Sequence, residues 1–447
     1  MKKILFVLSV LSSAALLCGA CRAHKPGSDP VNSLVGYTQA DFPVGMGLYT
    51  EGKRQYVAFY DSLKMLTLAQ RELPDGPWKY KCLDVTNPWD SHNYVTMIMD
   101  SRGVLHISGN MHVAGLQYWC TDKSGDISTV KRVYSLVGRD EDRMTYPKFI
   151  RMQDGGLLFH YRKGRSGNGV EIYDRMDPQG RWSRWLETPL TDGLDAMNAY
   201  MTEPKLRDGY YHMIWVWRND YDCATNHDLS YARSKDLRNW EDASGKPVSL
   251  PMTIADKQLI VDPVPVNGGL LNGGSVLGFD AEGRPMIAYH KYDPQDKTQI
   301  YLARFENGSW NSRKITDWDL AWHFSGGGSI IRELRINSVS ALRDGRIALV
   351  YSRLDPSLNK QWSKRIILDP DNLSIVREED HNPHFWPAEL DEVTSTFSPK
   401  MEAHVAADMA GGREWILRWE SMPNNRDMPF EGPPFPPASE LRVIKVR

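Results

Sequence analysis

Three side chains of proton-exchanging types stand at the same distance from a tight turn. His92, Tyr146 and Tyr200 each lie eight residues before the aspartate of a turn. Imidazole and phenol groups can act as general acids and bases when they are held against a substrate. The repeated spacing therefore predicts one site, assembled from equivalent positions in consecutive units of the chain.

Antiparallel pairing predicts the partners of these side chains, because residues that face each other across a hairpin have numbers that sum to a constant. By this rule His92 faces His112 or its immediate neighbour, and Tyr146 faces Arg162. An arginine can hold a carboxylate through two parallel hydrogen bonds, so the second pair adds an anion-binding group. We expect the catalytic residues to be His92, His112, Tyr146 and Arg162.

The same offset extends the predicted site into other units. Tyr200 has Arg218 on its return strand, and we expect both to bind the substrate. The equivalent positions in the fifth and seventh units are Asn272 and Lys400. None of these positions carries Asp or Glu, whereas glycoside hydrolases typically use a pair of carboxylates. We therefore expect a site without acidic side chains, which favours a lyase over a hydrolase.

A repeated unit must position these residues. It consists of an apolar strand, a tight turn rich in Asp, Gly and Arg, and a second strand rich in Tyr, Trp and aliphatic residues. The turns lie at 50–52, 100–103, 154–156, 207–209, 280–283, 343–345 and 410–412. The pattern predicts an all-β fold, a seven-bladed antiparallel β-propeller, in which equivalent positions converge at one end of the central channel. The alternating segment 440–446 is expected to complete the first blade and close the ring.

Composition limits the class of protein. The chain has 447 residues with 54 basic and 56 acidic side chains, and its net charge of −2 gives no reason to expect a nucleic-acid partner. The mean hydropathy of −0.48 excludes a protein that crosses a membrane several times. We expect a monomer.

The N-terminus indicates export. Lys2 and Lys3 precede an apolar run at 4–20 that is too short for an ordinary membrane span. Small residues lead into Cys21, as in a bacterial lipoprotein signal cleaved before that cysteine; a plain secretory signal cut elsewhere is the alternative. We expect a signal peptide at 1–20, a tether at 21–34, a propeller at 35–447, and a periplasmic or outer-membrane location with a lipid on Cys21 as the only membrane attachment.

A structural metal site is a further prediction. Three cysteines remain after cleavage, without a C-x-x-C pair, so the chain is not a disulfide scaffold. Cys223 and His227 are four residues apart in a predicted loop, and His290 follows a strand of the neighbouring unit. These side chains could bind structural zinc or, less typically, calcium between blades. The alternative is a free thiol beside hydrogen-bonded imidazoles, and the chemistry itself needs no cofactor.

Several stretches resemble the BNR-4 repeat family, which includes propeller-type ulvan lyases and related enzymes that act on rhamnosyl-glucuronate linkages. They lie at 91–95, 109–112, 145–147, 161–169 and 225–231. The resemblance begins near Val35 and is strongest through the first four units. It implies the same four catalytic residues, with Tyr200 as a further substrate contact. We also expect Asn168 to bind the substrate.

β-Elimination at a 4-linked uronate requires removal of its C5 proton, which is weakly acidic until the adjacent carboxylate is neutralised. Arg162 and His112 would neutralise that carboxylate, while His92 and Tyr146 would divide the roles of base and acid. Arg162 should also favour the ionised form of the Tyr146 phenol. We expect a lyase that acts on an acidic plant or algal polysaccharide, or its oligosaccharides, containing rhamnose and glucuronate.

Two other functions remain open. One is an exo-acting α-L-rhamnosidase-like hydrolase on rhamnosyl-glucuronate, and the other is a glycan-binding lipoprotein without activity. In the rhamnosidase-like branch of these propellers an essential histidine lies on the opposite face. That position falls near Gln55, and no histidine occurs at 51–60, which argues against the opposite-face chemistry.

Overall fold

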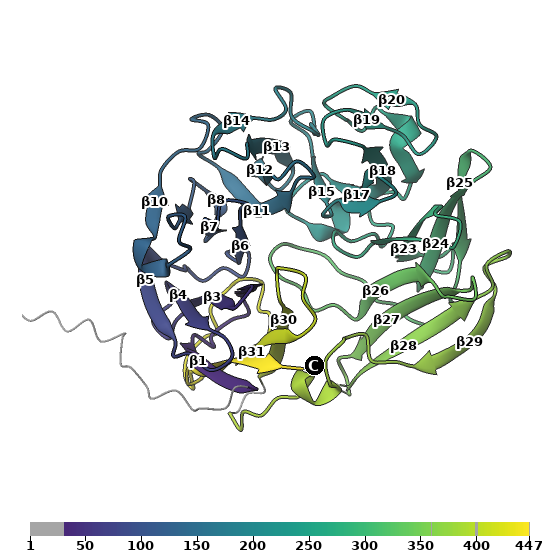
Figure 1. The fold of residues 1–447 in the computed structure, drawn as a ribbon. Coiled ribbons are helices and arrows are strands. Elements are labelled where there is room, and N and C mark those ends of the chain that lie inside the picture. Colours follow the sequence, from purple (N-terminus) through teal and green to yellow (C-terminus); the bar gives the residue numbers. More distant parts are fainter. Residues whose placement is uncertain (1–30, 359, 398–400, 447) are drawn as a thin grey trace, which may run out of the picture.

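The computed structural model describes residues 31–358, 360–397 and 401–446. These residues form seven antiparallel sheets that follow one another around a central axis (Figure 1). The expected all-β antiparallel propeller is confirmed. The predicted signal peptide, Cys21 and Lys400 lie outside the described residues.

The first four sheets are built from the following strands. The first has β2 (Gly47–Glu51), β3 (Arg54–Tyr60), β4 (Met65–Glu72) and β5 (Lys79–Thr86). The second has β6 (Val95–Met99), β7 (Leu105–Gly109), β9 (Tyr118–Cys120) and β10 (Lys131–Val133). The third has β8 (His112–Ala114), β11 (Met144–Arg151), β12 (Leu157–Arg165), β13 (Asn168–Met176) and β14 (Trp182–Arg184). The fourth has β15 (Asn198–Met201), β16 (Lys205–Arg207), β17 (Tyr210–Arg218), β18 (Asn226–Ser234), β19 (Trp240–Glu241), β20 (Pro247–Val248) and β21 (Ile260–Asp262).

The remaining three sheets have four strands each. The fifth has β22 (Val276–Phe279), β23 (Pro285–Tyr292), β24 (Thr298–Glu306) and β25 (Ser309–Lys314). The sixth has β26 (Leu334–Ala341), β27 (Ile347–Asp355), β28 (Lys360–Leu368) and β29 (Ile375–Asp380). The seventh has β30 (Glu402–Ala407), β31 (Trp415–Ser421), β32 (Ser439–Lys445) and β1 (Asn32–Thr38).

Helical structure in the described part of the chain is limited to short 3₁₀ segments. They are η1 (Ile127–Thr129), η2 (Cys223–Thr225), η3 (Lys257–Leu259) and η4 (Ala388–Asp391). Among the described residues, no helix has the length and apolar character needed to cross a membrane.

The ring is closed by strands from both ends of the described chain. β32 pairs with β31 and with β1, so the N-terminal strand joins the seventh sheet rather than the first. The prediction that 440–446 completes the first blade was wrong, because that sheet already has four strands of its own while the last unit supplies three. β1 also begins at Asn32, before the expected start of the propeller at residue 35.

Turn aspartates explain why the hairpins form where the sequence indicates. Asp100 accepts hydrogen bonds from the backbone N–H groups of Arg102 and Val104, and Asp280 accepts them from Glu282 and Arg284. A side chain that satisfies the backbone of its own turn stabilises that turn without help from other elements. The predicted turns are therefore local features that the sequence determines directly.

Both faces of each sheet are packed, so the core lies between neighbouring sheets. In β12, Leu158 packs against the fourth sheet together with Trp215, while Phe159 packs against the second sheet together with Tyr118. All four side chains are buried. This alternation orients the even-numbered residues of β12, including Arg162, toward the fourth sheet.

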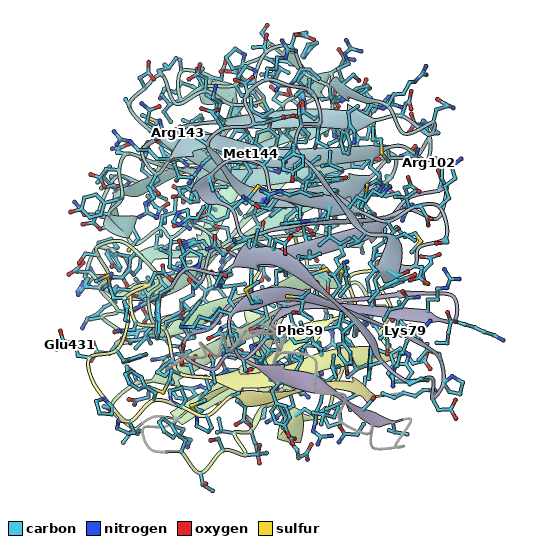
Figure 2. The ribbon with its side chains drawn as sticks, turned by 90° about the vertical axis from the view of Figure 1, so that its left-hand side faces the viewer. Phe59, Lys79, Arg102, Arg143, Met144 and Glu431 are labelled. Atoms are coloured by element: carbon cyan, nitrogen blue, oxygen red, sulfur yellow. The ribbon has the colours of Figure 1, made fainter. Side chains whose placement is uncertain are left out.

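The hairpin turns and the predicted site lie at opposite ends of the strands. β6 runs from Val95 toward the Asp100 turn, and β11 runs from Met144 toward the turn at 154–156. Seen from the side, Arg102 of a turn and Arg143, which precedes β11, lie on opposite sides of the molecule (Figure 2). His92 and Tyr146 therefore lie at the end of the channel away from these turns.

Candidate active site

The structure brings the predicted side chains of three sheets together at one end of the channel. The rings of His92 and His112 are stacked with their centroids 4.3 Å apart, and the Tyr146 ring lies 6.0 Å from that of His92. The Arg162 guanidinium lies 5.0 Å from the Tyr146 ring centroid and 5.8 Å from that of Tyr200. The hairpin arithmetic thus identified side chains that are neighbours in space.

The two histidines meet through loops rather than through the predicted strand pairing. The ladder between β6 and β7 ends at Val95 and Gly109. The chain then turns, and His112 opens β8, which pairs with β11 of the next sheet. Val113 has a φ of 54° and its N–H is bonded to the Thr145 hydroxyl, so the sharp exit from β7 is held by the third sheet.

Tyr146 occupies a β-bulge in β11, which corrects the predicted register. Thr145 faces Arg162 and Lys148 faces His160, so the pairing shifts between them and Tyr146 has no strand partner. Its φ is 60°, and the next residue is Pro147, which has no N–H to donate to the ladder. The bulge follows from that proline, and it re-aims the phenol relative to a regular strand.

The fourth sheet also differs from the expected register. Tyr200 faces Val216, and Arg218 faces Asn198. Arg218 nevertheless lies 5.3 Å from the Tyr200 ring centroid. Its guanidinium donates to the backbone carbonyls of Asp220 and Tyr221, which leaves it as a support for Tyr200 rather than an open anion site.

Asn272 also belongs to this support. Its side-chain oxygen accepts hydrogen bonds from Arg218 at 3.4 Å and from Asn226 at 3.1 Å. The fifth unit therefore contributes to the site indirectly, by fixing the residues that hold Tyr200.

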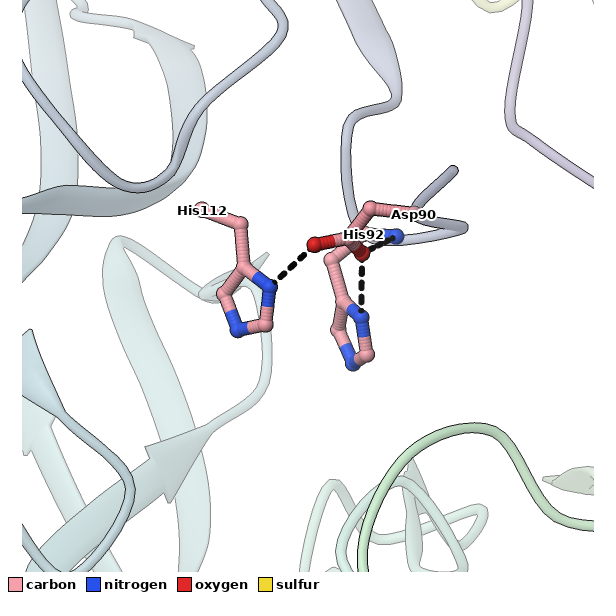
Figure 3. Close-up of side chains that lie close together, drawn as sticks. All are labelled: Asp90, His92 and His112. Carbon is pink, nitrogen blue, oxygen red and sulfur yellow. Dashed lines mark hydrogen bonds and ion pairs between the residues drawn. The ribbon is translucent and has the colours of Figure 1, made fainter. Parts of the chain in front are cut away.

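Asp90 links the two histidines, and sequence reasoning missed it. One carboxylate oxygen lies 2.9 Å from His92 Nδ1 and the other lies 2.5 Å from His112 Nδ1 (Figure 3). The expectation of a site without acidic side chains was wrong. The available signal was the Asp90-x-His92 spacing, because an Asp two residues before an N–H commonly caps a turn, as Asp90 does for the His92 backbone.

The Asp90 contacts fix how both imidazoles are presented. Since each Nδ1 faces Asp90, the two Nε2 atoms are directed away from it, side by side (Figure 3). A hydrogen bond at one ring nitrogen sets which nitrogen is free for a substrate. The pair therefore offers two Nε2 atoms to whatever enters the channel.

Charge in this cluster is balanced by carboxylates. Burial alone would lower the pKa of His92, but hydrogen bonds to Asp427 and Asp90 raise it to about 9. Burial acts to raise the pKa of Asp90, yet its hydrogen bonds to His112 and His92 hold it well below the usual range. At neutral pH His92 is an imidazolium and Asp90 a carboxylate, so Asp90 is not available as a proton donor.

The two tyrosines are tuned in opposite directions. Burial raises the pKa of Tyr146, and this effect outweighs the neighbouring Arg162. Burial also acts on Tyr200, but Arg162 and Arg218 together lower its pKa below the ordinary value. Arg162 favours the ionised form of Tyr146, as expected, but burial has the larger effect, so the pKa of Tyr146 is raised and its phenol stays protonated at neutral pH.

Arg162 is buried without a carboxylate partner. Its side chain is almost completely buried, and among the described residues its Nε and Nη2 have no hydrogen-bond acceptor. Nη1 makes one long contact of 3.4 Å with the Tyr200 hydroxyl. An unpaired buried guanidinium is costly to a fold, so this arrangement is suited to an anion supplied from outside.

Asn168 lies beside the cluster, at the rim of the third sheet. It lines a pocket of about 430 Å³ together with Arg143, Lys163 and Arg165. Lys163 is paired with Asp140, whereas no ion pair within the described chain engages Arg143 or Arg165. This pocket therefore contains two arginines that form no ion pair within the described chain.

The structure does not bring the predicted metal ligands together. Both ring nitrogens of His227 are engaged, by Asp228 at 2.7 Å and Asn219 at 2.8 Å, while His290 binds the Gly269 carbonyl through Nδ1. Cys223 is a buried free thiol. Within the described ranges, the one group of three potential ligand side chains is Asp90, His92 and His112, and these already bind one another.

The opposite end of the channel contains a separate pocket of about 720 Å³, lined among others by Tyr49, Glu51 and Arg151. Gln55 is buried nearby, where its side chain bonds Thr50 and Arg71. The residue expected near the alternative site is thus a structural glutamine.

Comparisons with known proteins identify the family of the chain. Residues 54–318 match the model of a family described as BNR repeat-containing family member. The long isoform of ulvan lyase from Pseudoalteromonas sp. (strain PLSV) is 26% identical over 172 residues, covering 36% of this chain and 16% of that protein. The short isoform from Alteromonas sp. (strain LOR) is 28% identical over 133 residues, covering 27% of this chain and 25% of that protein. The matches therefore span a quarter or less of these relatives.

Two solved structures share the fold over nearly the whole chain. The polysaccharide lyase Uly1 has a TM-score of 0.58 at 14% identity, covering 92% of each chain. An ulvan lyase of polysaccharide lyase family PL25, bound to -[GlcA(1-4)Rha3S]-, has a TM-score of 0.57 at 14% identity, covering 94% of this chain and 96% of that one. At this identity the likeness concerns the fold.

Proposed function

Because the chain belongs to the BNR repeat-containing family, we propose that it is a polysaccharide lyase that cleaves a rhamnose- and glucuronate-containing acidic glycan by β-elimination at the uronate. The ulvan lyases among its relatives and fold neighbours support this reaction class. The pocket arginines Arg143 and Arg165 support an acidic substrate.

One observation carries the proposal: the buried, unpaired guanidinium of Arg162. A uronate carboxylate would supply the acceptors that Nε and Nη2 lack, in the planar two-bond geometry that arginine favours. The His92 imidazolium adds a second positive charge at the same end of the channel. Neutralising the carboxylate makes the C5 proton easier to remove, which is the central requirement of the elimination.

The two tyrosines both lie next to Arg162, and this placement supports a division of the proton transfers between them. Tyr200, with its lowered pKa, takes the C5 proton as base. The electrons of the C5–H bond form the C4=C5 double bond as the C4–O4 bond breaks. Tyr146, whose raised pKa keeps it protonated, donates its proton to the leaving O4. His112 holds Asp90 and stacks on His92, so it maintains the imidazole pair.

The product distinguishes this reaction from its alternatives. We expect incubation with ulvan, gum arabic or a rhamnosyl-glucuronate oligosaccharide to produce the ultraviolet absorbance of a 4,5-unsaturated uronate. Rhamnose release without that absorbance would indicate the hydrolase instead. Saturable glycan binding without turnover on any substrate would indicate a binding protein.

The cellular context forms part of the proposal. The protein is exported and held at the membrane through a lipid on Cys21, acts as a monomer and needs no cofactor for the reaction. Mass spectrometry of the mature N-terminus tests the anchor, because cleavage before Cys21 leaves a diacylglyceryl cysteine. Sedimentation tests the oligomeric state.

A further inference from the structure

A loop of the seventh sheet reaches across the ring to the histidine pair. Asp427 follows β31, and its carboxylate contacts four groups from elsewhere in the chain. It accepts hydrogen bonds from the Ser91 N–H at 3.1 Å and the Ser329 N–H at 3.0 Å, and it lies 3.3 Å from His92 Nδ1. The Ser91 hydroxyl also donates to it. The loops that carry Ser91, Ser329 and Asp427 are therefore joined at one carboxylate.

This junction continues around the same end of the propeller. Arg426 donates to the backbone carbonyls of Ser325 and Gly327, at 2.6 Å and 3.2 Å. Gly326 in turn accepts from the Cys223 N–H and donates to the Asp222 carboxylate. A chain of hydrogen bonds thus connects the His92 loop to the fourth sheet on the side away from Tyr146.

The backbone at the junction is strained. Arg426 and Asp427 have φ values of 56° and 57°, in the left-handed region that side chains other than glycine rarely adopt. Two consecutive residues in this conformation persist only where their surroundings hold them, and such strain concentrates at functional sites. The strain turns the Asp427 carboxylate back toward Ser91 and His92.

Asp427 also completes the charge balance. Asp90 is shared between two imidazoles, so a second carboxylate is needed to give His92 a partner of its own. The other titratable groups against His92 are the His112 ring and the Tyr146 phenol. Asp427 lies outside residues 54–318, the segment that matches the family model.

We propose that Asp427 is a positioning residue. From a loop of the seventh sheet, its carboxylate holds the His92 imidazole in place and favours its charged form. The site is therefore complete only when the seventh sheet is in place. This inference rests on the proposed function for its kinetic consequences. Its effect on the His92 imidazole does not depend on that function.

The test compares Asp427→Asn with the unaltered protein by following the histidine resonances through a pH titration, with His92→Gln used to assign His92. We expect the His92 pKa to fall by about one unit, because an opposite charge in contact is removed. Asp427→Glu should restore most of the difference, since it restores the charge. An unchanged His92 pKa in a folded Asp427→Asn protein would overturn the proposal.

Kinetics provide the second readout. Asp427→Asn should lower kcat by about 10-fold with a smaller change in KM, as for other residues that orient a catalytic group. Asp408→Asn is the matched control, because Asp408 lies in the same sheet but binds the Thr50 N–H at the opposite end of the channel. Equal losses in both variants would contradict a positioning role.

A third variant guards against misfolding. Ser91→Ala removes one contact to Asp427 and leaves the Asp427 charge in place, so this variant should keep the His92 pKa and most of kcat.

The titration also separates failure of the positioning role from failure of the proposed function. If the unaltered protein makes no unsaturated product, the proposed function fails, and the titration still decides the positioning role. If Asp427→Asn does not fold, Asp427→Ser replaces it in the titration, and an unchanged His92 pKa in that variant would overturn the proposal.

Discussion

Arg162 combines full burial with unsatisfied hydrogen-bonding capacity, which is the opposite of what stability favours. A buried guanidinium without an acceptor destabilises the folded state, and replacing it by an apolar side chain of similar volume removes that cost. Arg162 therefore behaves as a residue retained for binding.

Arg162→Met should separate stability from activity. We expect its free energy of unfolding to rise by about 1 kcal/mol, because an orphaned charge is lost, while elimination activity disappears. Arg162→Lys should keep the charge but lose the planar pair of donors, with kcat/KM falling about 100-fold. Arg181→Lys, at an exposed arginine paired with Asp177, is the control and should be nearly silent. Denaturant titrations and absorbance assays measure both effects, and a destabilised Arg162→Met protein would contradict the interpretation.

The pH dependence should reflect His92. Its folded pKa of about 9 is raised above the ordinary value, so it is charged at neutral pH and loses its proton as the pH rises through about 9. Activity should decline over that range, and so should the stability contributed by its contacts with Asp90 and Asp427, which is fully present below about 6.5. Asp90→Asn should move the decline to lower pH. A pH profile that is identical in both proteins would exclude His92 as the titrating group.

Irregular backbone, rather than regular strand, presents the site. His92 lies in a loop, His112 follows a sharp turn into β8, and Tyr146 occupies the bulge before Pro147. The bulge re-aims one side chain while the rest of β11 keeps its pairing. The position of the Tyr146 phenol therefore depends on Pro147, which interrupts the strand pairing of β11.

Pro147→Ala tests the bulge. Alanine restores an N–H and widens the backbone conformations of the unfolded chain, so we expect a loss of about 1 kcal/mol in stability. We also expect kcat to fall by about 10-fold, because the phenol of Tyr146 is no longer fixed. Thermal unfolding and kcat measure the two effects. Lys148→Ala, in the regular part of β11, should leave kcat unchanged.

Local signals were sufficient to predict the turns and the residues that gather at the channel. The aspartate of a turn accepts hydrogen bonds from the backbone N–H groups of that turn, as Asp100 does. Short segments of sequence are therefore enough to predict the hairpins and which residues face each other across them. The role of Asp427 and the destination of β32 could not be read in this way, because each depends on contacts between units. The bulge at Tyr146 and the role of Asp90 had local signals, Pro147 and the Asp90-x-His92 spacing, but a hairpin sum overlooks them because it assumes an uninterrupted ladder.

At the scale of the whole molecule, charge is uneven although the net charge is only −2. Arg143, Lys163 and Arg165 line one pocket of the third sheet. Such a concentration of one sign attracts a polyanion and is weakened by salt. The rim is therefore expected to matter for polymers more than for small substrates.

Removing the rim charges should change polymer kinetics selectively. For Arg143→Ala combined with Arg165→Ala we expect KM for an acidic polysaccharide to rise about 10-fold at low salt, with kcat unchanged. Added salt should reduce the difference between the proteins. KM for a disaccharide should change little, and Arg181→Ala combined with Arg346→Ala, which also removes two surface arginines, is the control. A polymer KM that is insensitive to both the mutations and salt would place polymer binding elsewhere.

The pairing of β1 with β32 also sets an order of events during synthesis. The His92 loop is made before the Asp427 loop and β32. A nascent chain can therefore form its first sheets and stack its histidines before Asp427 exists, and Asp427 reaches His92 only once the chain extends past it. A chain that stops before Asp427 would carry the catalytic residues without the contacts that position them.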